Sequence, residues 1–140
     1  MSENSVIQMY GTADTDASAT IDIPDDGILL SVQMLMLQTG QAADGDYAIG
    51  QIAFGSVSQF VTNDARGVLA VCGSNAELAG TAANVIRGDV QSNIYFGEDG
   101  IKVFGGERIY LHMGGGGNMA TFRCYALLVF NFKNFIQRRR

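Results

Sequence analysis

Hydrophobic and polar residues alternate with a period of two in several short runs of this 140-residue chain. Side chains of a β-strand point alternately to opposite faces of a sheet, so each run predicts a strand. In residues 121–132, one predicted face carries Phe122, Cys124, Ala126, Leu128, Phe130 and Phe132. The other predicted face carries Arg123, Tyr125, Leu127, Val129 and Asn131. This run therefore predicts a strand with one face in a core and one mixed face outside it.

Residues 28–38 form a second long run with the same period. The predicted core positions are Ile28, Leu30, Val32, Met34 and Met36, and the predicted outward positions are Leu29, Ser31, Gln33, Leu35 and Leu37. The outward face becomes apolar at its end. Together with Leu127 and Val129, we expect Leu35 and Leu37 to lie in a contact between subunits.

Shorter strands are predicted at residues 6–10, 19–23, 47–54, 68–72, 85–86, 92–96, 101–104 and 108–113. Turn signals separate them, notably Pro24 to Gly27 and the predicted hairpin turn of residues 97–100. Residues 74–84 are left open between a short helix and a loop, because Ser74 and Glu77 fit a capping box but Gly80 weakens a helix. Eight to ten short strands with at most one helix predict an all-β, jelly-roll-like antiparallel β-sandwich in residues 1–132.

Composition indicates a surface that is partly covered by other molecules. Charged residues make up 16% of the chain, against about 25% in an average domain. The alternative is a monomer coated with uncharged polar residues. No apolar run reaches the ~18 residues of a membrane span, and no basic and apolar leader precedes the first strand, so we expect a soluble domain without membrane contact.

Charge is divided unevenly between the body and residues 133–140, which form a predicted basic tail. The last ten residues contain no acid and four basic residues: Lys133, Arg138, Arg139 and Arg140. The earlier part of the chain has five basic and fourteen acidic residues, and therefore a net charge of −9. The acidic body disfavours nucleic acid as a partner. We expect Phe135 and Ile136 to anchor the tail on an acidic partner while the three arginines pair with carboxylates, the alternative being a frayed end.

Residues with the chemistry of an active site are scarce. His112 is the only histidine, so neither a multi-histidine metal site nor an ordinary catalytic triad can be assembled within one subunit, and we expect it at a surface or interface. Cys72 and Cys124 are predicted to be small buried residues, paired only if their strands are neighbours. The glycines at 114–117 lack the following helix of a phosphate loop and are predicted to form a loop between strands. We expect no enzyme activity, no cofactor and no metal.

Residues 101–112, the glycine loop after them and residues 120–128 resemble the closing strands of small jelly-roll virion proteins of tailed bacteriophages. The resemblance implies a structural protein that cements or decorates the capsid, located in the virion after assembly in the host cytoplasm. It also implies a homotrimer that contacts other virion proteins such as the major capsid protein. The alternative is a carbohydrate- or receptor-binding β-sandwich module, in which sugars would stack on Tyr10, Tyr47, Tyr95, Tyr110 and Tyr125.

Overall fold

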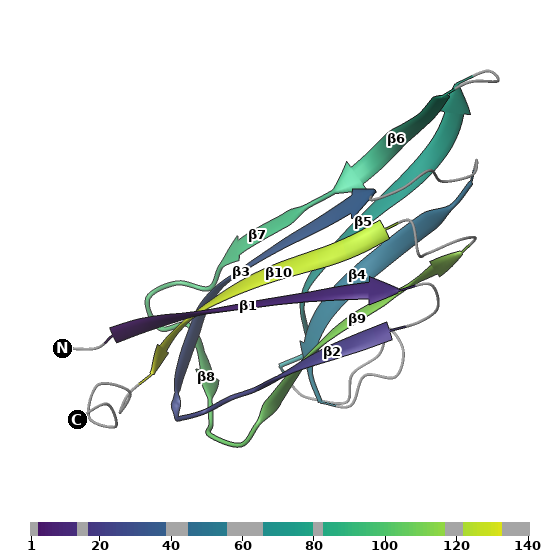
Figure 1. Cartoon of the computed structure of the whole chain (residues 1–140). Coiled ribbons are helices and arrows are strands. Elements are labelled where there is room, and N and C mark those ends of the chain that lie inside the picture. Colours follow the sequence, from purple (N-terminus) through teal and green to yellow (C-terminus); the bar gives the residue numbers. More distant parts are fainter. Residues whose placement is uncertain are drawn as a thin grey trace.

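The structure is a computed structural model that describes the backbone of residues 3–13, 17–38, 45–55, 66–79, 83–116 and 122–132. These residues form ten β-strands joined by turns (Figure 1). The strands are β1 (Glu3–Ala13), β2 (Ala17–Asp22), β3 (Gly27–Gln38), β4 (Tyr47–Phe54), β5 (Val68–Ala79), β6 (Ala83–Val90), β7 (Ser92–Tyr95), β8 (Ile101–Val103), β9 (Arg108–Gly116) and β10 (Phe122–Phe132). No helix long and apolar enough to cross a membrane is found in the described part of the chain.

The strands pair in two antiparallel sheets. Sheet A has the order β1-β10-β3-β7, with β8 also paired to β3, and sheet B has the order β2-β9-β4-β5-β6. The pairs are nested in sequence: β1 with β10, β2 with β9, and β3 with β8. Nesting of this kind arises when one long antiparallel hairpin rolls up into the two sheets of a jelly roll. The predicted jelly-roll-like sandwich is confirmed, with β6 as an additional edge strand.

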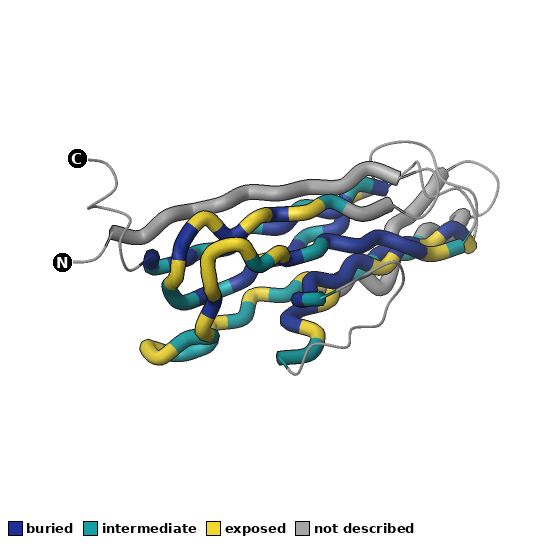
Figure 2. The backbone as a smooth tube through the Cα atoms, turned by 90° about the horizontal axis from the view of Figure 1, so that it is seen from below, coloured by how far each residue is buried: buried dark blue, intermediate teal, exposed yellow. Residues whose placement is uncertain are grey.

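The two sheets enclose one hydrophobic core, and Figure 2 shows the buried positions alternating along the strands of both layers. The clearest example is β10, which alternates between buried and half-buried residues from Phe122 to Phe132, as its sequence predicts. The rings of Phe130 and Phe132 stack with their centroids 5.0 Å apart. The largest fully buried side chains are Phe54, Phe122, Phe130, Phe132, Ile23, Leu29, Met36, Ile52, Ile109, Leu111, Met113 and Leu128.

A β-bulge interrupts the pairing of β3 with β10 between Val129 and Phe130, and it leaves Leu30 without a partner in the ladder. An extra residue in one strand shifts the alternation of its side chains by one position. Leu29 is therefore fully buried, whereas Ile28 and Leu30 are half-buried, and the core face predicted for these three residues was wrong. Beyond the bulge the predicted core positions are confirmed: Val32, Met34 and Met36.

Residues 74–79 and 83–84 are extended where a short helix or a loop was predicted, and residues 80–82 lie outside the described residues. Strand β5 continues to Ala79, and β6 begins at Ala83. Within this segment β5 pairs with β4 up to Asn75 and with β6 as far as Ala79. Hydrogen bonds to two neighbouring strands satisfy more backbone groups than one helical turn capped by Ser74 would, so sheet pairing overrides the local capping signal.

Residues 97–100 form a turn but not the predicted hairpin. The amide of Gly100 donates a hydrogen bond to the carbonyl of Gly97 at 3.2 Å, and both glycines have positive φ angles of 55° and 89°. The strands on either side do not pair with each other, because β7 and β8 both pair with β3 at successive positions along its edge. The turn therefore connects two strands that pair one after the other with the same edge of β3.

The glycines after Met113 belong to β9 as far as Gly116, and not to a loop as predicted. At Gly115 a Cβ atom would lie 2.2 Å from the backbone oxygen of Tyr47. At Gly116 it would lie 2.6 Å from the Tyr47 ring. Glycine is thus required here for the close approach of β9 to β4.

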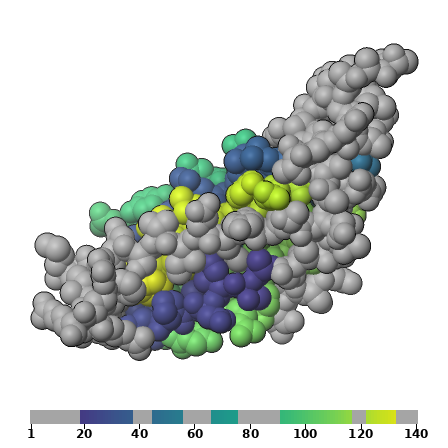
Figure 3. Space-filling model, in the orientation of Figure 1, coloured from purple at the N-terminus to yellow at the C-terminus, as the bar shows by residue number. Residues whose placement is uncertain are grey.

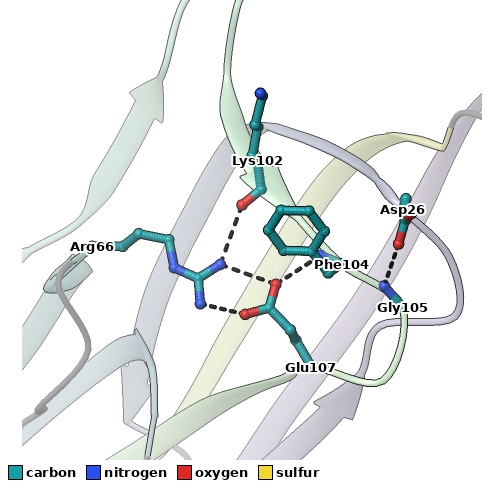
Figure 4. Close-up of polar contacts among 6 residues, drawn as sticks. All are labelled: Asp26, Arg66, Lys102, Phe104, Gly105 and Glu107. Atoms are coloured by element: carbon teal, nitrogen blue, oxygen red, sulfur yellow. Dashed lines mark hydrogen bonds and ion pairs between the residues drawn. The ribbon is translucent and has the colours of Figure 1, made fainter.

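A polar cluster ties the start of β5 to the turn between β8 and β9 (Figure 4). The two terminal nitrogens of Arg66 bond both carboxylate oxygens of Glu107, and one of them also donates to the carbonyl of Lys102 at 3.2 Å. Glu107 accepts a hydrogen bond from the amide of Phe104 at 2.7 Å. The guanidinium of Arg66 also lies 3.5 Å from the ring centroid of Phe54.

Candidate assembly surface

The outer face of sheet A is built from alternate residues of β7, β3 and β10. Paired residues of antiparallel strands point to the same face, so the ladders define rows of outward side chains. From β7 to β10 these rows are Tyr95, Ser31 and Val129; Asn93, Gln33 and Leu127; Leu35 and Tyr125; and Leu37 and Arg123. Figure 3 shows side chains of these three strands lying side by side. Arg123 is the single charged residue in these four rows, and the exposed Lys102 of β8 stands in a further row of the face with Ile28 and Asn131.

Four residues predicted for the subunit contact lie on this face. Leu37 is 42% exposed, while Leu35, Leu127 and Val129 are half-buried by their neighbours. Tyr95, which was not among the predicted contact residues, is more exposed than any of them at 65%. The alternation of the sequence thus placed the four residues correctly on the outward side, and their role in assembly stays a prediction.

The remaining predicted contact residues lie outside the described residues. They are Phe135, Ile136, Arg138, Arg139 and Arg140. The last described residue is Phe132, which is 1% exposed and pairs with Gly27 on one side and Glu3 on the other.

A hollow of about 450 Å³ opens on the outer face of sheet A beside the start of β7. Strand β7 pairs with β3 only between Ser31 and Met34. The hollow lies where this pairing along the edge of β3 ends. Its lining combines apolar side chains with amides and a tyrosine: Gln33, Met34, Leu35, Gln91, Ser92, Asn93, Tyr125, Ala126 and Leu127. Within the lining, the hydroxyl of Tyr125 accepts a hydrogen bond from Arg123 at 3.4 Å.

A second apolar surface lies on the outer face of sheet B and was missed by the sequence analysis. Three of its residues are between 41% and 45% exposed: Tyr47, Ile49 and Val71. Ile49 and Tyr47 are exposed because glycines stand beside them on β9: Gly114 pairs with Ile49 and Gly116 with Tyr47. The signal in the sequence was the glycine run, but its alignment with β4 is a property of the fold.

His112 was expected at a surface or an interface; it is 2% exposed, so it does not lie at a free surface, and a place at an interface stays a prediction. It does point away from the core, since it alternates with the core residues Leu111 and Met113. It pairs with Gln51 of β4, which is 3% exposed. Among the described residues, no group of three His, Cys, Asp or Glu side chains is placed to hold a metal ion.

The two cysteines are buried, as predicted. Cys72 lies in β5 of sheet B and Cys124 in β10 of sheet A, and their Sγ atoms are 3.6 Å apart. The candidate sugar-stacking tyrosines are dispersed: Tyr47 is on sheet B, while Tyr95 and Tyr125 are on sheet A. Tyr110 is half-buried on β9, and the side chain of Tyr10 lies outside the described residues.

No protein-family model matches the chain, and no curated protein matches it. Among solved structures, a chain in the structure of infectious bursal disease virus (Gx strain) is similar, with 16% sequence identity and a TM-score of 0.38. The similarity covers 94% of this chain and 32% of that one, so the present chain spans about a third of the length of the similar viral chain.

Proposed function

We propose that this chain is a structural protein of a virus particle, specifically a cement or decoration protein of a tailed phage. In this role it acts by covering and joining other subunits, not by catalysis. The jelly-roll order of its strands supports the proposal, because this architecture recurs in viral capsid domains. The observation that carries it is the outer face of sheet A, where four rows across β7, β3 and β10 hold one charged residue, Arg123, and the row at β8 adds only Lys102.

A face with so few charges loses little when water is removed from it. The centres of protein interfaces are depleted of charged residues and enriched in aromatic ones, and here Tyr95 and Tyr125 flank the aliphatic residues. Burying one apolar side chain completely contributes about 1.5–3 kcal/mol. Leu37 and a few half-buried neighbours therefore supply enough driving force for association if a partner covers them together.

We propose that the chain forms a homotrimer and that this trimer contacts the major capsid protein. Sheet A would form the contacts between copies, and the basic tail of residues 133–140 would reach a neighbouring acidic surface. In a closed ring of three copies each subunit joins one patch to a second, complementary patch of its neighbour, so that no interface is left unpaired.

The test compares two substitutions of equally exposed apolar residues on opposite sheets. Leu37 on sheet A is 42% exposed, and Val71 on sheet B is 45% exposed. Leu37→Asp places a charge in the proposed contact and should lower the oligomeric mass to that of a monomer. Val71→Asp should leave the mass unchanged. Mass is measured by light scattering at micromolar concentration, with circular dichroism to verify folding.

Two results would contradict the proposal. The first is a wild-type monomer near the chain mass of 14.9 kDa that is also missing from purified particles by mass spectrometry. The second is loss of assembly in Val71→Asp together with an unchanged mass in Leu37→Asp, which would place the contact on sheet B.

The hollow beside β7 supports a second candidate, a carbohydrate-binding module. Gln33 and Asn93 offer amide donors and acceptors for sugar hydroxyls, and Tyr125 offers a ring edge at the same hollow. A glycan array with wild type and Asn93→Ala tests it. Binding of a defined glycan that disappears in Asn93→Ala favours this function, and an array without signal excludes it for the glycans present.

A further inference from the structure

Two thiols from opposite sheets meet in the middle of the core. Cys72 is 2% exposed and Cys124 is 0% exposed, and the residues are 52 positions apart in the sequence. Their sulfurs are 3.6 Å apart, which is about the contact distance of two sulfur atoms and suits a hydrogen bond between them. Pairing was expected only if their strands were neighbours, and β5 and β10, from opposite sheets, meet across the core at these two sulfurs.

Gly50 of β4 keeps this space open for the two sulfurs. A Cβ atom at position 50 would lie 2.6 Å from Sγ of Cys124 and 3.1 Å from Sγ of Cys72. Either distance is too short for a carbon and a sulfur in contact. Gly50 pairs with Cys72 in the β4–β5 ladder, so any side chain there would point at the thiol pair.

We propose that Cys72 and Cys124 are an oxidation site, at which a small peroxide converts the thiol pair into a disulfide that joins the two sheets. A disulfide bond is about 2.05 Å long, so the sulfurs must approach each other by about 1.5 Å. Gly50 has no side chain and so leaves room beside both sulfurs for this approach.

The reaction proceeds in two balanced steps. The sulfur of Cys72 attacks one peroxide oxygen, an S–O bond forms, the O–O bond breaks, and the thiol proton leaves with the released water. The sulfur of Cys124 then attacks the sulfenic sulfur of Cys72, which forms the S–S bond and releases the hydroxyl with the second thiol proton as water. Two thiols and one peroxide thus yield one disulfide and two waters.

The backbone of Gly50 distinguishes the two sulfurs, because it hydrogen-bonds Cys72 and this contact remains when Cys124 is replaced. The hydrogen bond with Cys124 lowers the pKa of Cys72, against the opposing effect of burial, and the backbone of Gly50 lowers it further. The same bond to Cys72, followed by burial, raises the pKa of Cys124. Cys72 is therefore the thiol that reaches its nucleophilic form first, and Cys124 is the resolving thiol.

The consequence is a chain that is reduced inside a reducing compartment and cross-linked outside it. The disulfide is buried like the thiols, so bulky thiol reductants reach it poorly once it has formed. The new bond closes a long loop between sheets, and the chain-entropy model predicts a rise in melting temperature on the order of 10 °C.

The test treats the folded full-length chain with hydrogen peroxide, quenches with a thiol-alkylating reagent in denaturant, and measures intact mass. The expected product has lost the mass of two hydrogen atoms, carries no alkyl group, melts at higher temperature and yields a peptide containing Cys72 linked to Cys124. Two alkylated thiols, oxygen adducts without a cross-link, or disulfides only between chains would each overturn the proposal.

Single-cysteine variants test the assigned roles separately. In Cys124→Ala the remaining Cys72 should form a sulfenic acid that a dimedone-type reagent traps, while in Cys72→Ala the remaining Cys124 should react more slowly. The reverse order of reactivity would overturn the assignment. Neither variant can lose two hydrogen atoms within one chain.

Gly50→Ala tests the geometry, with Gly73→Ala as its matched control. A methyl group at position 50 displaces both sulfurs, so disulfide formation should slow by on the order of a hundredfold. At position 73, next to Cys72 in β5, a Cβ atom meets the Ala48 oxygen at 3.2 Å and neither sulfur. Gly73→Ala should therefore oxidise at the wild-type rate. Equal rates in both folded variants would show that Gly50 does not hold the thiols in register, and if Gly50→Ala does not fold, the wild-type mass measurement still decides.

Discussion

Replacing Arg66 with alanine should destabilise the fold through the cluster that joins the start of β5 to the β8–β9 turn. Arg66 makes a two-point ion pair with Glu107, bonds the carbonyl of Lys102, and stacks over Phe54, which is fully buried. The side chains of the ion pair are 25% and 26% exposed. They are thus shielded from water more than an ordinary surface pair and less than a pair in the core.

The size of the effect follows from this intermediate burial. Exposed ion pairs contribute about 0–1 kcal/mol, and breaking a buried pair costs about 3–5 kcal/mol. A quarter-exposed, two-point pair lies between these limits, and the contact with Phe54 adds about 0.5–1 kcal/mol. We expect Arg66→Ala to lower the free energy of unfolding by about 2–3 kcal/mol, which corresponds to about 8–12 °C in melting temperature for a chain of this size.

Arg108→Ala is the matched control, because Arg108 makes the same kind of pair with Asp22 at 2.7 Å but in open solvent. Its hydrogen bond to the Asp22 carboxylate raises the pKa of Arg108, yet the two side chains are 53% and 72% exposed. Arg108→Ala should therefore have the same melting temperature as the wild type. A double-mutant cycle with Glu107→Ala isolates the pair, and urea unfolding should give a coupling energy of about 1–2 kcal/mol. Equal losses in Arg66→Ala and Arg108→Ala, or a coupling energy of zero, would refute the reasoning.

Three further predictions concern the rest of the fold and its chemistry. Gly115→Ala should destabilise the domain by about 1–3 kcal/mol in urea unfolding, because its Cβ atom would lie 2.2 Å from the Tyr47 carbonyl oxygen. An unfolding curve identical to that of the wild type would contradict this, because it would mean that β9 can move away from β4 without loss of stability. Deletion of residues 133–140 should leave the melting temperature unchanged but weaken assembly or attachment to particles, and a truncated chain that keeps its oligomeric mass and still binds particles would contradict the assigned role of the tail. Treatment with a chelator should not change the melting temperature, and a stoichiometric metal in elemental analysis, lost together with stability, would show that the prediction is wrong.

Strand β10 was predictable because nothing interrupts its alternation. Strand β4 begins and ends where the sequence places it, although a register shift between Ile52 and Ala53 breaks its alternation, and the described β10 covers the predicted run from Phe122 onward. The misassigned face of Leu29 and Leu30 has a different origin. A bulge on β3 is decided by its pairing with Val129 and Phe130, which lie about a hundred residues later in the chain. The local alternation of the sequence therefore does not reveal such an insertion.

The same limit explains the misread segment around Ser74. Ser74 and Glu77 carry the local signature of a helix start, whereas the pairing partners of β5 come from β4 and β6. The ladder with β4 reaches Asn75 and the ladder with β6 continues to Ala79, whereas a short helix would leave its terminal groups unpaired. The turn at residues 97–100 shows a related limit, since its glycines predict the turn itself but not which strand lies beside it.

For the candidate surfaces, the sequence predicts direction and the fold determines exposure. Alternation alone places Leu37, Leu127 and Val129 on the outward side of sheet A, but how much of each remains exposed depends on the neighbouring strands. On sheet B, Ile49 and Tyr47 are uncovered because β9 presents glycine beside each of them, and His112 shows that an outward position can be buried. Exposure of a large apolar side chain in a sheet is thus a property of the row to which it belongs. A residue and its cross-strand partners must be considered together, which requires the register and therefore the fold.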